Sequence, residues 1–275
     1  MKLSRFVGAF CAIGLSLNAV SAMSAPVDFN TWTPESYPAV SSFPAGQWNV
    51  AGGGSSVNQV NNGQPTFFYS DFNTQGSAFT GSITVTGSDD DYIGFALGFQ
   101  PGDSTSPAAD YLLIDWKAVS QNFDFNGGGD GPGGIAERGL AVSRVTGVPT
   151  ADEFWQHVDN DLTGSPLGAG LQELQRGNNL SDTGWVLGTT YEFTFDFGPN
   201  NLDVFVNSVL ELSIVGNFND GRFGFYNFSQ AGVNYSGFTK DPGSFPSAVP
   251  VPAAVWLFGT ALVGFIGYSR RRNLA

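Results

Sequence analysis

The chain has 275 residues, with 24 Asp and Glu against 11 Lys and Arg, and a formal net charge of −13 at neutral pH. An acidic chain of this kind repels nucleic acid and anionic lipid, and it attracts divalent cations or basic partners. The single cysteine, Cys11, lies in the N-terminal apolar run, so the rest of the chain has neither a disulfide nor a thiol nucleophile.

The first 22 residues have the pattern of a secretory signal peptide. Lys2 and Arg5 precede the apolar run 6–20, and small residues follow it up to Ala22. Signal peptidase is therefore expected to cleave after Ala22 and to release an exported chain. In the next segment, 23–71, prolines recur and three glycines follow at 52–54. The alternatives for this lead-in are added edge strands or a flexible, extended segment.

Aromatic residues and glycines predict an all-β fold. The 25 Phe, eight Tyr, six Trp and 37 Gly are typical of many short strands joined by tight turns. In the clearest strand, Tyr191–Phe197, aromatic and polar residues alternate, so one face packs on a core and the other meets water. Eleven strands predict two antiparallel sheets packed face to face. The other ten are expected at 47–51, 66–69, 79–86, 92–99, 111–118, 140–145, 202–206, 209–215, 222–228 and 232–238.

Three carboxylates, Asp89, Asp90 and Asp91, stand together at the entrance of the strand 92–99. Their mutual repulsion is costly unless a cation or well-placed amides compensate it. Calcium suits them because it takes six to eight oxygen ligands in a flexible geometry. In an extended strand alternate side chains share a face, so Asp89 and Asp91 are expected to converge while Asp90 points elsewhere. The alternative is an ordinary acidic turn in solvent.

The middle of the chain offers weaker candidates. The segment 122–134, rich in glycine, predicts a long mobile loop, and a helical turn is expected only at 169–176. Asp159 and Asp161 have the alternating oxygen ligands of a second calcium site but lack the distal Glu of an EF-hand loop. Trp116, Trp155 and Trp185 are candidates for stacking on a sugar, because aromatic rings pack on pyranose faces. Core packing is the default for each, and Trp155 is the one most expected on a loop, as a possible glycan contact.

Catalytic patterns are scarce. His157 is the sole histidine, and we expect it on a loop, so neither a zinc site with two His nor a serine triad with its Gly-x-Ser-x-Gly elbow is available. None of the six Glu forms a pattern that gathers three carboxylates in one cleft. We therefore predict that the chain is not an enzyme, while catalysis by Asp stays open.

Two of the expected strands are spaced as a hairpin. The strands 202–206 and 209–215 are separated by Asn207-Ser208, which is the spacing of a two-residue turn. This hairpin is expected at an edge of the sandwich.

Four motifs, in this order, resemble the C-terminal domain of thrombospondins. The Asp-rich turn leads into a strand that ends Gly-Phe-Gln at 98–100, and a later strand closes on Trp116-Lys117; Gly184-Trp185 and the segment 221–238 follow. The resemblance covers roughly residues 72–238 and implies a concanavalin A-like jelly-roll sandwich, calcium at Asp-rich loops and adhesion to surface or matrix molecules. The repeats that precede this domain in thrombospondins and the Arg-Gly-Asp tripeptide are absent. The resemblance therefore implies that this chain shares the fold of the thrombospondin domain, but it does not imply the same binding partner.

The C-terminal tail resembles the PEP-CTERM sorting signal of Gram-negative bacteria. A short proline motif precedes an apolar segment, 253–268, and a basic cluster follows, so the charges stop the segment in the membrane. The resemblance implies an inner-membrane intermediate that an exosortase recognises and cleaves; a permanent anchor is the alternative. The motif residues are Val249, Pro250, Val251 and Pro252, and the basic ones are Arg270, Arg271 and Arg272.

In domain terms the sequence predicts a signal peptide at 1–22, a lead-in at 23–71, a lectin-like sandwich at 72–247 and a sorting signal at 249–275. The predicted function is an exported, non-catalytic adhesion protein of the cell surface or extracellular matrix, stabilised by calcium. The alternatives are a carbohydrate-binding module for exopolysaccharide, a glycoside hydrolase of the same fold and a structural protein of the matrix without a specific ligand.

Overall fold

The computed structural model describes residues 24–38, 43–125, 134–158 and 170–242. The predicted signal peptide, the sorting motif with its basic cluster, and the candidate ligands Asp159 and Asp161 lie outside these residues. Within the described ranges, no helix has the length and apolar character needed to cross a membrane.

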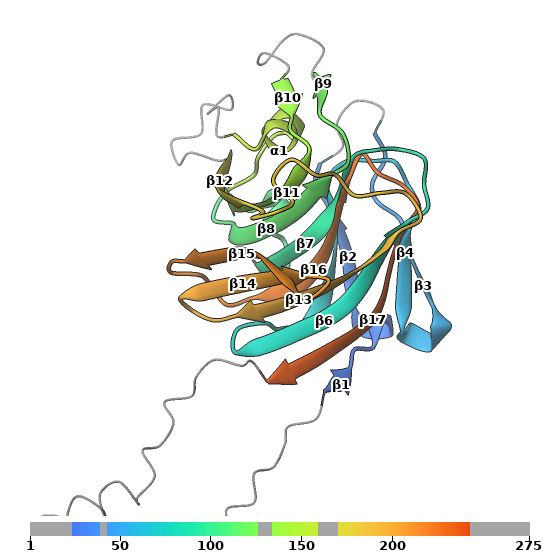
Figure 1. Ribbon diagram of the computed structural model, residues 1–275, viewed down its shortest axis with the longest axis vertical. Helices are drawn as coiled ribbons and strands as arrows, with labels where there is room; N and C mark the ends of the chain where they lie inside the picture. Colours follow the sequence, from blue (N-terminus) through green and yellow to red (C-terminus); the bar gives the residue numbers. More distant parts are fainter. Residues whose placement is uncertain (1–23, 39–42, 126–133, 159–169, 243–275) are drawn as a thin grey trace, which may run out of the picture.

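Two large antiparallel sheets form the body of the molecule, which confirms the predicted all-β fold (Figure 1). The eight-stranded sheet has the order β15-β14-β13-β6-β17-β4-β3, with β1 paired to β17. Its strands are β1 (Ala25–Pro26), β3 (Trp48–Ala51), β4 (Ser56–Gln59), β6 (Ser77–Val85), β13 (Thr190–Phe197), β14 (Asn201–Val206), β15 (Val209–Val215) and β17 (Val233–Pro242).

The seven-stranded sheet has the order β12-β11-β8-β7-β16-β5-β2. Its strands are β2 (Thr33–Ser36), β5 (Thr66–Asn73), β7 (Tyr92–Phe99), β8 (Asp110–Lys117), β11 (Gly139–Thr146), β12 (Gly170–Arg176) and β16 (Arg222–Phe228). A separate hairpin joins β9 (Gln121–Phe123) to β10 (Gly134–Ala136). The helices of the described part are α1 (Ala151–Gln156) and the short 3-10 turns η1 (Phe29–Thr31), η2 (Gly52–Gly54) and η3 (Asp103–Thr105).

Apolar side chains cover both faces of the seven-stranded sheet. One cluster lies between the sheets and joins Phe79 and Phe195 of the eight-stranded sheet to Phe95 and Phe223 of the other. A second cluster lies on the opposite face, where Phe154 and other residues of α1 pack on the sheet. Every residue of β7 is buried as a result. A strand covered on both faces reads as a continuous apolar run rather than an alternating one.

The eight-stranded sheet is covered on one face only. Along β6, Phe79, Ile83 and Val85 are buried in the core, whereas Thr80, Ser82 and Thr84 are partly exposed on the other side. The alternation predicted from the sequence is therefore confirmed for this strand.

Two predictions of local structure are wrong. The segment 170–176 is the strand β12, paired with β11, and not a helical turn, because pairing at a sheet edge outweighs a weak local preference. The helix is instead α1, and Thr150 is its N-cap. The Thr150 hydroxyl accepts the backbone N–H of Glu153, while the Glu153 carboxylate accepts that of Thr150. This capping box is readable in the sequence as Thr-x-x-Glu.

The ends of the segment 122–134 are also more ordered than a loop. Phe123 pairs with Gly134, and Asn122 pairs with Ile135, so these ends form the hairpin β9–β10. Residues 126–133, which connect the two strands, lie outside the described residues.

Candidate functional site

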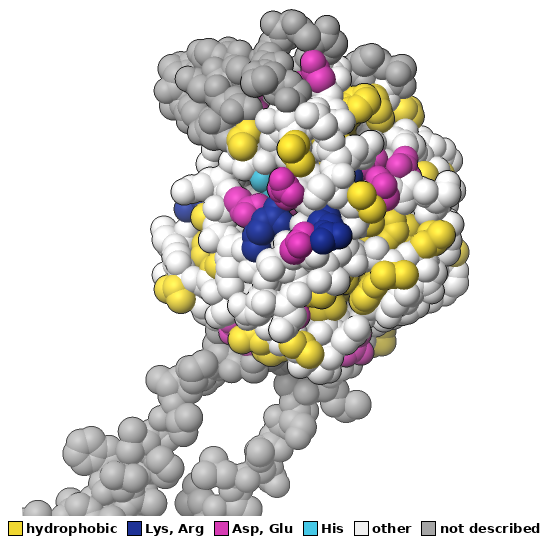
Figure 2. All heavy atoms as spheres, turned by 45° about the horizontal axis from the view of Figure 1, so that its top comes forward, with side chains coloured by type: hydrophobic (Ala, Val, Ile, Leu, Met, Phe, Trp, Pro, Cys, Tyr) yellow, Lys and Arg dark blue, Asp and Glu magenta, His cyan; other side chains and the backbone are white. Residues whose placement is uncertain are grey.

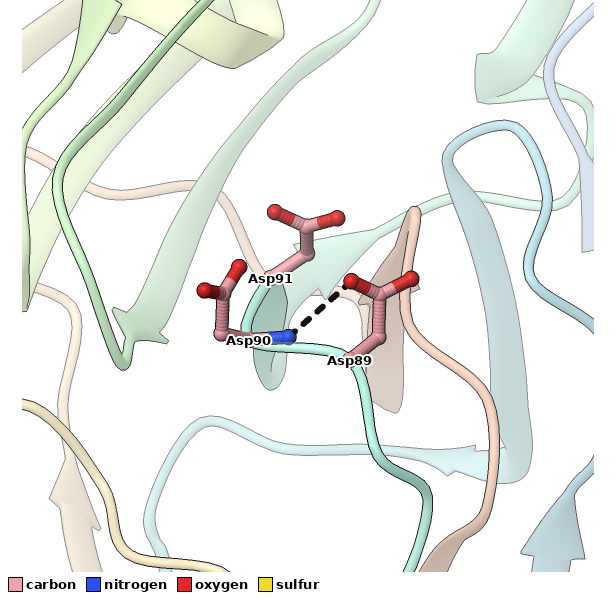
Figure 3. Close-up of side chains that lie close together, drawn as sticks. All are labelled: Asp89, Asp90 and Asp91. Atoms are coloured by element: carbon pink, nitrogen blue, oxygen red, sulfur yellow. Dashed lines mark hydrogen bonds between the residues drawn. The ribbon is translucent and has the colours of Figure 1, made fainter.

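The Asp-rich turn lies between β6 and β7 and brings its three carboxylates together. One oxygen from each of Asp89, Asp90 and Asp91 lies within 4.8 Å of the others (Figure 3). The backbone N–H of Asp90 donates to Asp89 Oδ1 at 3.1 Å, and the amide of Asn62 donates to the Asp89 carboxylate. The predicted alternation, with Asp90 pointing away, is wrong. These residues precede the first residue of β7, and the two-residue repeat holds only within a strand.

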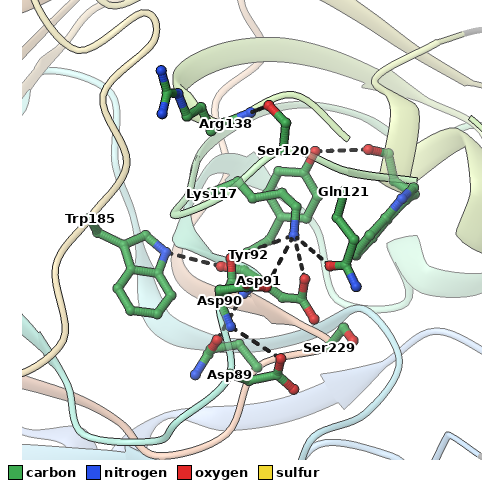
Figure 4. A network of polar contacts seen from close by, with 12 residues as sticks. Asp89, Asp90, Asp91, Tyr92, Lys117, Ser120, Gln121, Arg138, Trp185 and Ser229 are labelled. Atoms are coloured by element: carbon green, nitrogen blue, oxygen red, sulfur yellow. Dashed lines mark hydrogen bonds and ion pairs between the residues drawn. The ribbon is translucent and has the colours of Figure 1, made fainter. Parts of the chain in front are cut away.

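A buried lysine reaches into this turn from the end of β8. Lys117 is 0% exposed, and its ammonium pairs with the Asp91 carboxylate, which is itself buried. The same nitrogen lies 4.0 Å from Asp90 Oδ1 and 3.4 Å from Gln121 Oε1 (Figure 4). Burial raises the pKa of Asp91, and the charge of Lys117 opposes that rise. The compensating cation at Asp91 is therefore part of the chain.

Hydrogen bonds from other elements hold the turn in place. The indole N–H of Trp185 donates to the Asp91 carbonyl at 3.0 Å, and Gln230 Oε1 accepts the Asp91 backbone N–H at 2.9 Å. The backbone N–H of Ala118 donates to the Asp90 carbonyl at 3.1 Å. Trp185 and Gln230 belong to two of the motifs on which the family resemblance rests, so the structure brings these motifs together at the turn.

A calcium ion does not fit this set of ligands through Asp91. Calcium requires six to eight oxygen ligands, and here an ammonium group already binds the Asp91 carboxylate. A divalent ion beside a buried ammonium would also be repelled by it. Of the three predicted calcium ligands in the turn, only Asp89 and Asp90 remain without a buried ammonium in direct contact. The Asp90 side chain is 44% exposed.

His157 lies in the turn directly after α1, as expected for a residue outside the strands, but it is buried. It ends α1 in the left-handed conformation, with a φ of 55°. Its Nε2 lies 2.9 Å from Asp115 Oδ2, and its Nδ1 lies 3.3 Å from Glu173 Oε2. Burial opposes the charged imidazolium, but the two carboxylates outweigh it and raise the pKa of His157 to about 9. Because both ring nitrogens face carboxylates, neither is left to activate a nucleophile.

Ion pairs continue from this network to the surface. Arg176 Nε lies 3.1 Å from Glu173 Oε1, and Arg138 forms a bidentate pair with Asp182. Figure 2 shows basic and acidic side chains gathered side by side on one face of the molecule. Arg138 and Arg176 are thus each paired with a carboxylate.

Trp155 is buried in α1, so it packs in the core, which was the default expectation, and its possible role as a glycan contact on a loop is wrong. It is 1% exposed and packs against Phe125 and Phe228. The two other tryptophans that were candidates for stacking on a sugar, Trp116 and Trp185, are also buried. In the described part of the chain, these three indole rings belong to the core.

Two crevices in the described part of the chain offer no room for a sugar substrate. One, beside Arg144, is lined by Tyr111 and Phe218, and another lies between the sheets beside Ile93 and Phe193. Neither encloses space for a water molecule. Enzyme and small-molecule sites are normally concave and preformed, and neither crevice has that form.

The outer face of the eight-stranded sheet carries hydroxyl and amide side chains, with acidic ones such as Glu192 and Asp196 further along β13 on the same face. The strand registers place one polar residue of each of five neighbouring strands in a single row. Thr84 Oγ1 and Thr190 Oγ1 in this row lie 2.8 Å apart. Figure 1 shows α1 and the β9–β10 hairpin at the far end of the molecule from β6 and β17. The row consists of Thr190, Thr84, Asn234, Asn58 and Asn49, all partly or fully exposed.

Comparison with models of known protein families identifies the family of this chain. The family model of the thrombospondin C-terminal region matches residues 43–241, which is more than half of the chain. The chain belongs to this family. The match begins before residue 72, where the sequence resemblance was placed, so the thrombospondin C-terminal region of this chain includes β3, β4 and β5. A search of curated proteins found no match.

Solved structures with a similar fold include lectin-like proteins. A carbohydrate-binding module, CBM66 from Bacillus subtilis, is 10% identical with a TM-score of 0.46, and the alignment covers 74% of this chain and 99% of the module. Galectin LEC-6 from Caenorhabditis elegans is 12% identical with a TM-score of 0.34, over 63% of this chain and 93% of the galectin.

Proposed function

We propose that this member of the thrombospondin C-terminal family is a non-catalytic binding protein whose ligand is an extracellular polysaccharide. The chain would be exported, sorted through its C-terminal signal by an exosortase, and placed at the cell surface or in the extracellular matrix. The polysaccharide ligand corresponds to the alternative drawn from the sequence, and it narrows the broader prediction of an adhesion protein. Calcium is left out of the proposal because Lys117 occupies the Asp91 carboxylate.

The open face of the eight-stranded sheet carries the proposal. The row from Thr190 to Asn49 crosses five neighbouring strands and contains no charged residue. Asn and Thr side chains both donate and accept hydrogen bonds, as sugar hydroxyls do. Neighbouring strands lie about 4.8 Å apart, so an extended polymer laid across them meets one such side chain at each strand. An uncharged row that repeats from strand to strand suits a polymer better than a small substrate.

Two further observations agree with a binding role. Neither crevice encloses space for a substrate, and both ring nitrogens of the only histidine face carboxylates. Hydrolysis of a glycan requires two carboxyl groups on either side of the bond that breaks, and an open row of amides and hydroxyls does not supply them. The face therefore supports holding a chain of sugars rather than cutting it.

The test removes two amides from the row. Purified protein should bind a soluble neutral polysaccharide such as dextran, measured by calorimetry, and Asn58→Leu/Asn234→Leu should weaken the affinity about tenfold or more, since each lost hydrogen bond is worth about 1 kcal/mol. Asn122→Leu, an exposed position on the β9–β10 hairpin, is the matched control and should bind as the wild type does.

Three results would contradict this proposal. One is a wild-type protein that binds neither dextran nor an acidic polysaccharide such as alginate. Another is equal binding by the wild type and the double variant. The third is release of reducing ends from the polysaccharide, which would identify a glycoside hydrolase instead.

A further inference from the structure

Lys117 is the only fully buried lysine among the described residues, and its surroundings are unusual for an ammonium group. Burying a charge costs several kcal/mol unless it is paired and hydrogen-bonded. Here the Asp91 carboxylate supplies the pair, and Gln121 Oε1 and the Asp90 carbonyl lie 3.4 and 3.5 Å from Nζ. Three oxygen partners thus face the ammonium from one side (Figure 4).

Aromatic rings lie on its other sides. Nζ of Lys117 is 4.3 Å from the ring centroid of Trp155 and 5.4 Å from that of Tyr92. A cation over an aromatic face is attracted to the ring electrons, most strongly when water is excluded. Such rings cannot act as ligands for calcium, which requires oxygen atoms. The pocket is therefore shaped for an ammonium group and not for a divalent ion.

We propose that the ammonium of Lys117 is the resident cation of the Asp-rich turn, and that it takes the place of a calcium ion there. Each of the three carboxylates then has its own compensation. Asp91 pairs with Lys117, and Asp89 accepts the amide of Asn62. Asp90 Oδ1 lies 4.0 Å from the same ammonium, and its side chain is 44% exposed to solvent. No carboxylate of the turn needs a divalent ion for its charge to be tolerated.

This cation also joins three elements that are distant in the sequence. Lys117 ends β8, Asp91 precedes β7, and Trp155 belongs to α1, which packs on the outer face of the seven-stranded sheet. A calcium site at the turn would bind the turn alone, whereas the lysine side chain links the turn to α1. Loss of the ammonium should therefore loosen α1 as well as the turn.

The experiment measures thermal unfolding of the full chain in calcium chloride and in EDTA. The wild-type midpoint should be the same in both, because a ligand bound only by the native state would raise it. Lys117→Met keeps the length of the side chain and removes the charge, which leaves Asp91 buried without its cation. Its midpoint should fall by roughly 10 °C.

Two further variants separate the role of the charge from simple damage to the core. Lys117→Met/Asp91→Asn removes both charges and should recover most of the lost midpoint even if Lys117→Met alone fails to fold. Lys240→Met is the matched control: Nζ of Lys240 is 4.3 Å from the ring centroid of Phe72, yet this lysine is partly exposed, so its loss should change the midpoint little.

The proposal is overturned if EDTA lowers the wild-type midpoint, because the turn then depends on a metal ion. It is also overturned if Lys117→Met unfolds at the wild-type temperature. A double variant that is no more stable than Lys117→Met would equally contradict it, because the charge pair would not be the reason for the loss.

Discussion

At the scale of single residues, the buried charges are what distinguish this sandwich from a purely apolar one. His157 lies between Asp115 and Glu173, and Lys117 lies between Asp91 and two aromatic rings. Breaking a buried pair is costly because the remaining charge loses its partner but does not regain its water. The His157 pairs connect the end of α1 to β8 and β12. The Lys117–Asp91 pair connects β8 to the turn, and the contact of its ammonium with the Trp155 ring reaches α1. The helix is therefore held by charge as well as by packing.

The stability of the protein should depend on pH through His157. Its pKa in the folded protein is raised to about 9 from an ordinary value of 6.5. The stabilisation by the imidazolium is therefore fully present below about pH 6.5 and is lost as the pH rises through about 9, by on the order of 3 kcal/mol. His157→Asn, which tolerates the left-handed backbone, should be less stable than the wild type at pH 6.5 and close to it at pH 10.

Urea unfolding of the two proteins at several pH values between 6 and 10 measures this difference. A gap that stays constant over the whole range would show that His157 contributes packing and not charge.

At the scale of elements, tight turns set how the strands pair. The hairpin β14–β15 turns at Asn207 and Ser208, whose φ angles are 49° and 66°, as a two-residue turn requires. The hairpin and its place at the edge of the eight-stranded sheet were predicted and are confirmed. Asn207 also fixes the turn to β13, because its side-chain oxygen accepts the Glu192 backbone N–H at 2.9 Å.

Replacing Ser208 by glycine should stabilise the protein. The left-handed backbone conformation costs roughly 1 kcal/mol for a residue with a side chain, whereas glycine adopts it without this cost. Ser208→Gly is therefore expected to raise the unfolding free energy by up to about 1 kcal/mol. Ser213→Gly in the middle of β15 is the control and should lower it, since glycine weakens an extended strand. Denaturant unfolding of both variants measures the two signs, and a loss of stability in Ser208→Gly would refute the argument.

At the scale of the whole molecule, the segment before the family match is part of the fold. Phe29 and Trp32 are 0% and 6% exposed and belong to the core between the sheets, where their ring centroids are 5.2 and 4.9 Å from that of Phe225. The strand β2, directly after them, forms the edge of the seven-stranded sheet. Of the two alternatives for the lead-in, the structure shows added edge strands in this part of it.

Trp32→Ala should therefore destabilise the entire sandwich. The truncation of a buried indole typically costs about 3–5 kcal/mol, and the loss should appear in one cooperative transition because both sheets contact this core. Thr33→Ala, at the neighbouring exposed position, should cost far less. Urea unfolding followed by fluorescence measures both variants. A Trp32→Ala protein within 0.5 kcal/mol of the wild type, a small fraction of the cost given above, would show that the lead-in is not part of the core.

The sequence by itself determined the fold class, the family and nearly all the long strands, because period-two alternation and runs such as Tyr92–Phe99 are set by burial along a single strand. Tertiary structure alone decided the candidate sites. The strand β12 forms through pairing with β11, the burial of Trp155 depends on α1 lying against the sheet, and the carboxylates of Asp91 and Asp115 meet Lys117 and His157 from other elements. The contacting residues are 26 and 42 positions apart in the sequence, and contacts at such distances produce no periodic pattern along the chain. An acidic cluster is therefore predicted as a calcium site from the sequence, and only the tertiary structure shows the lysine that pairs with it.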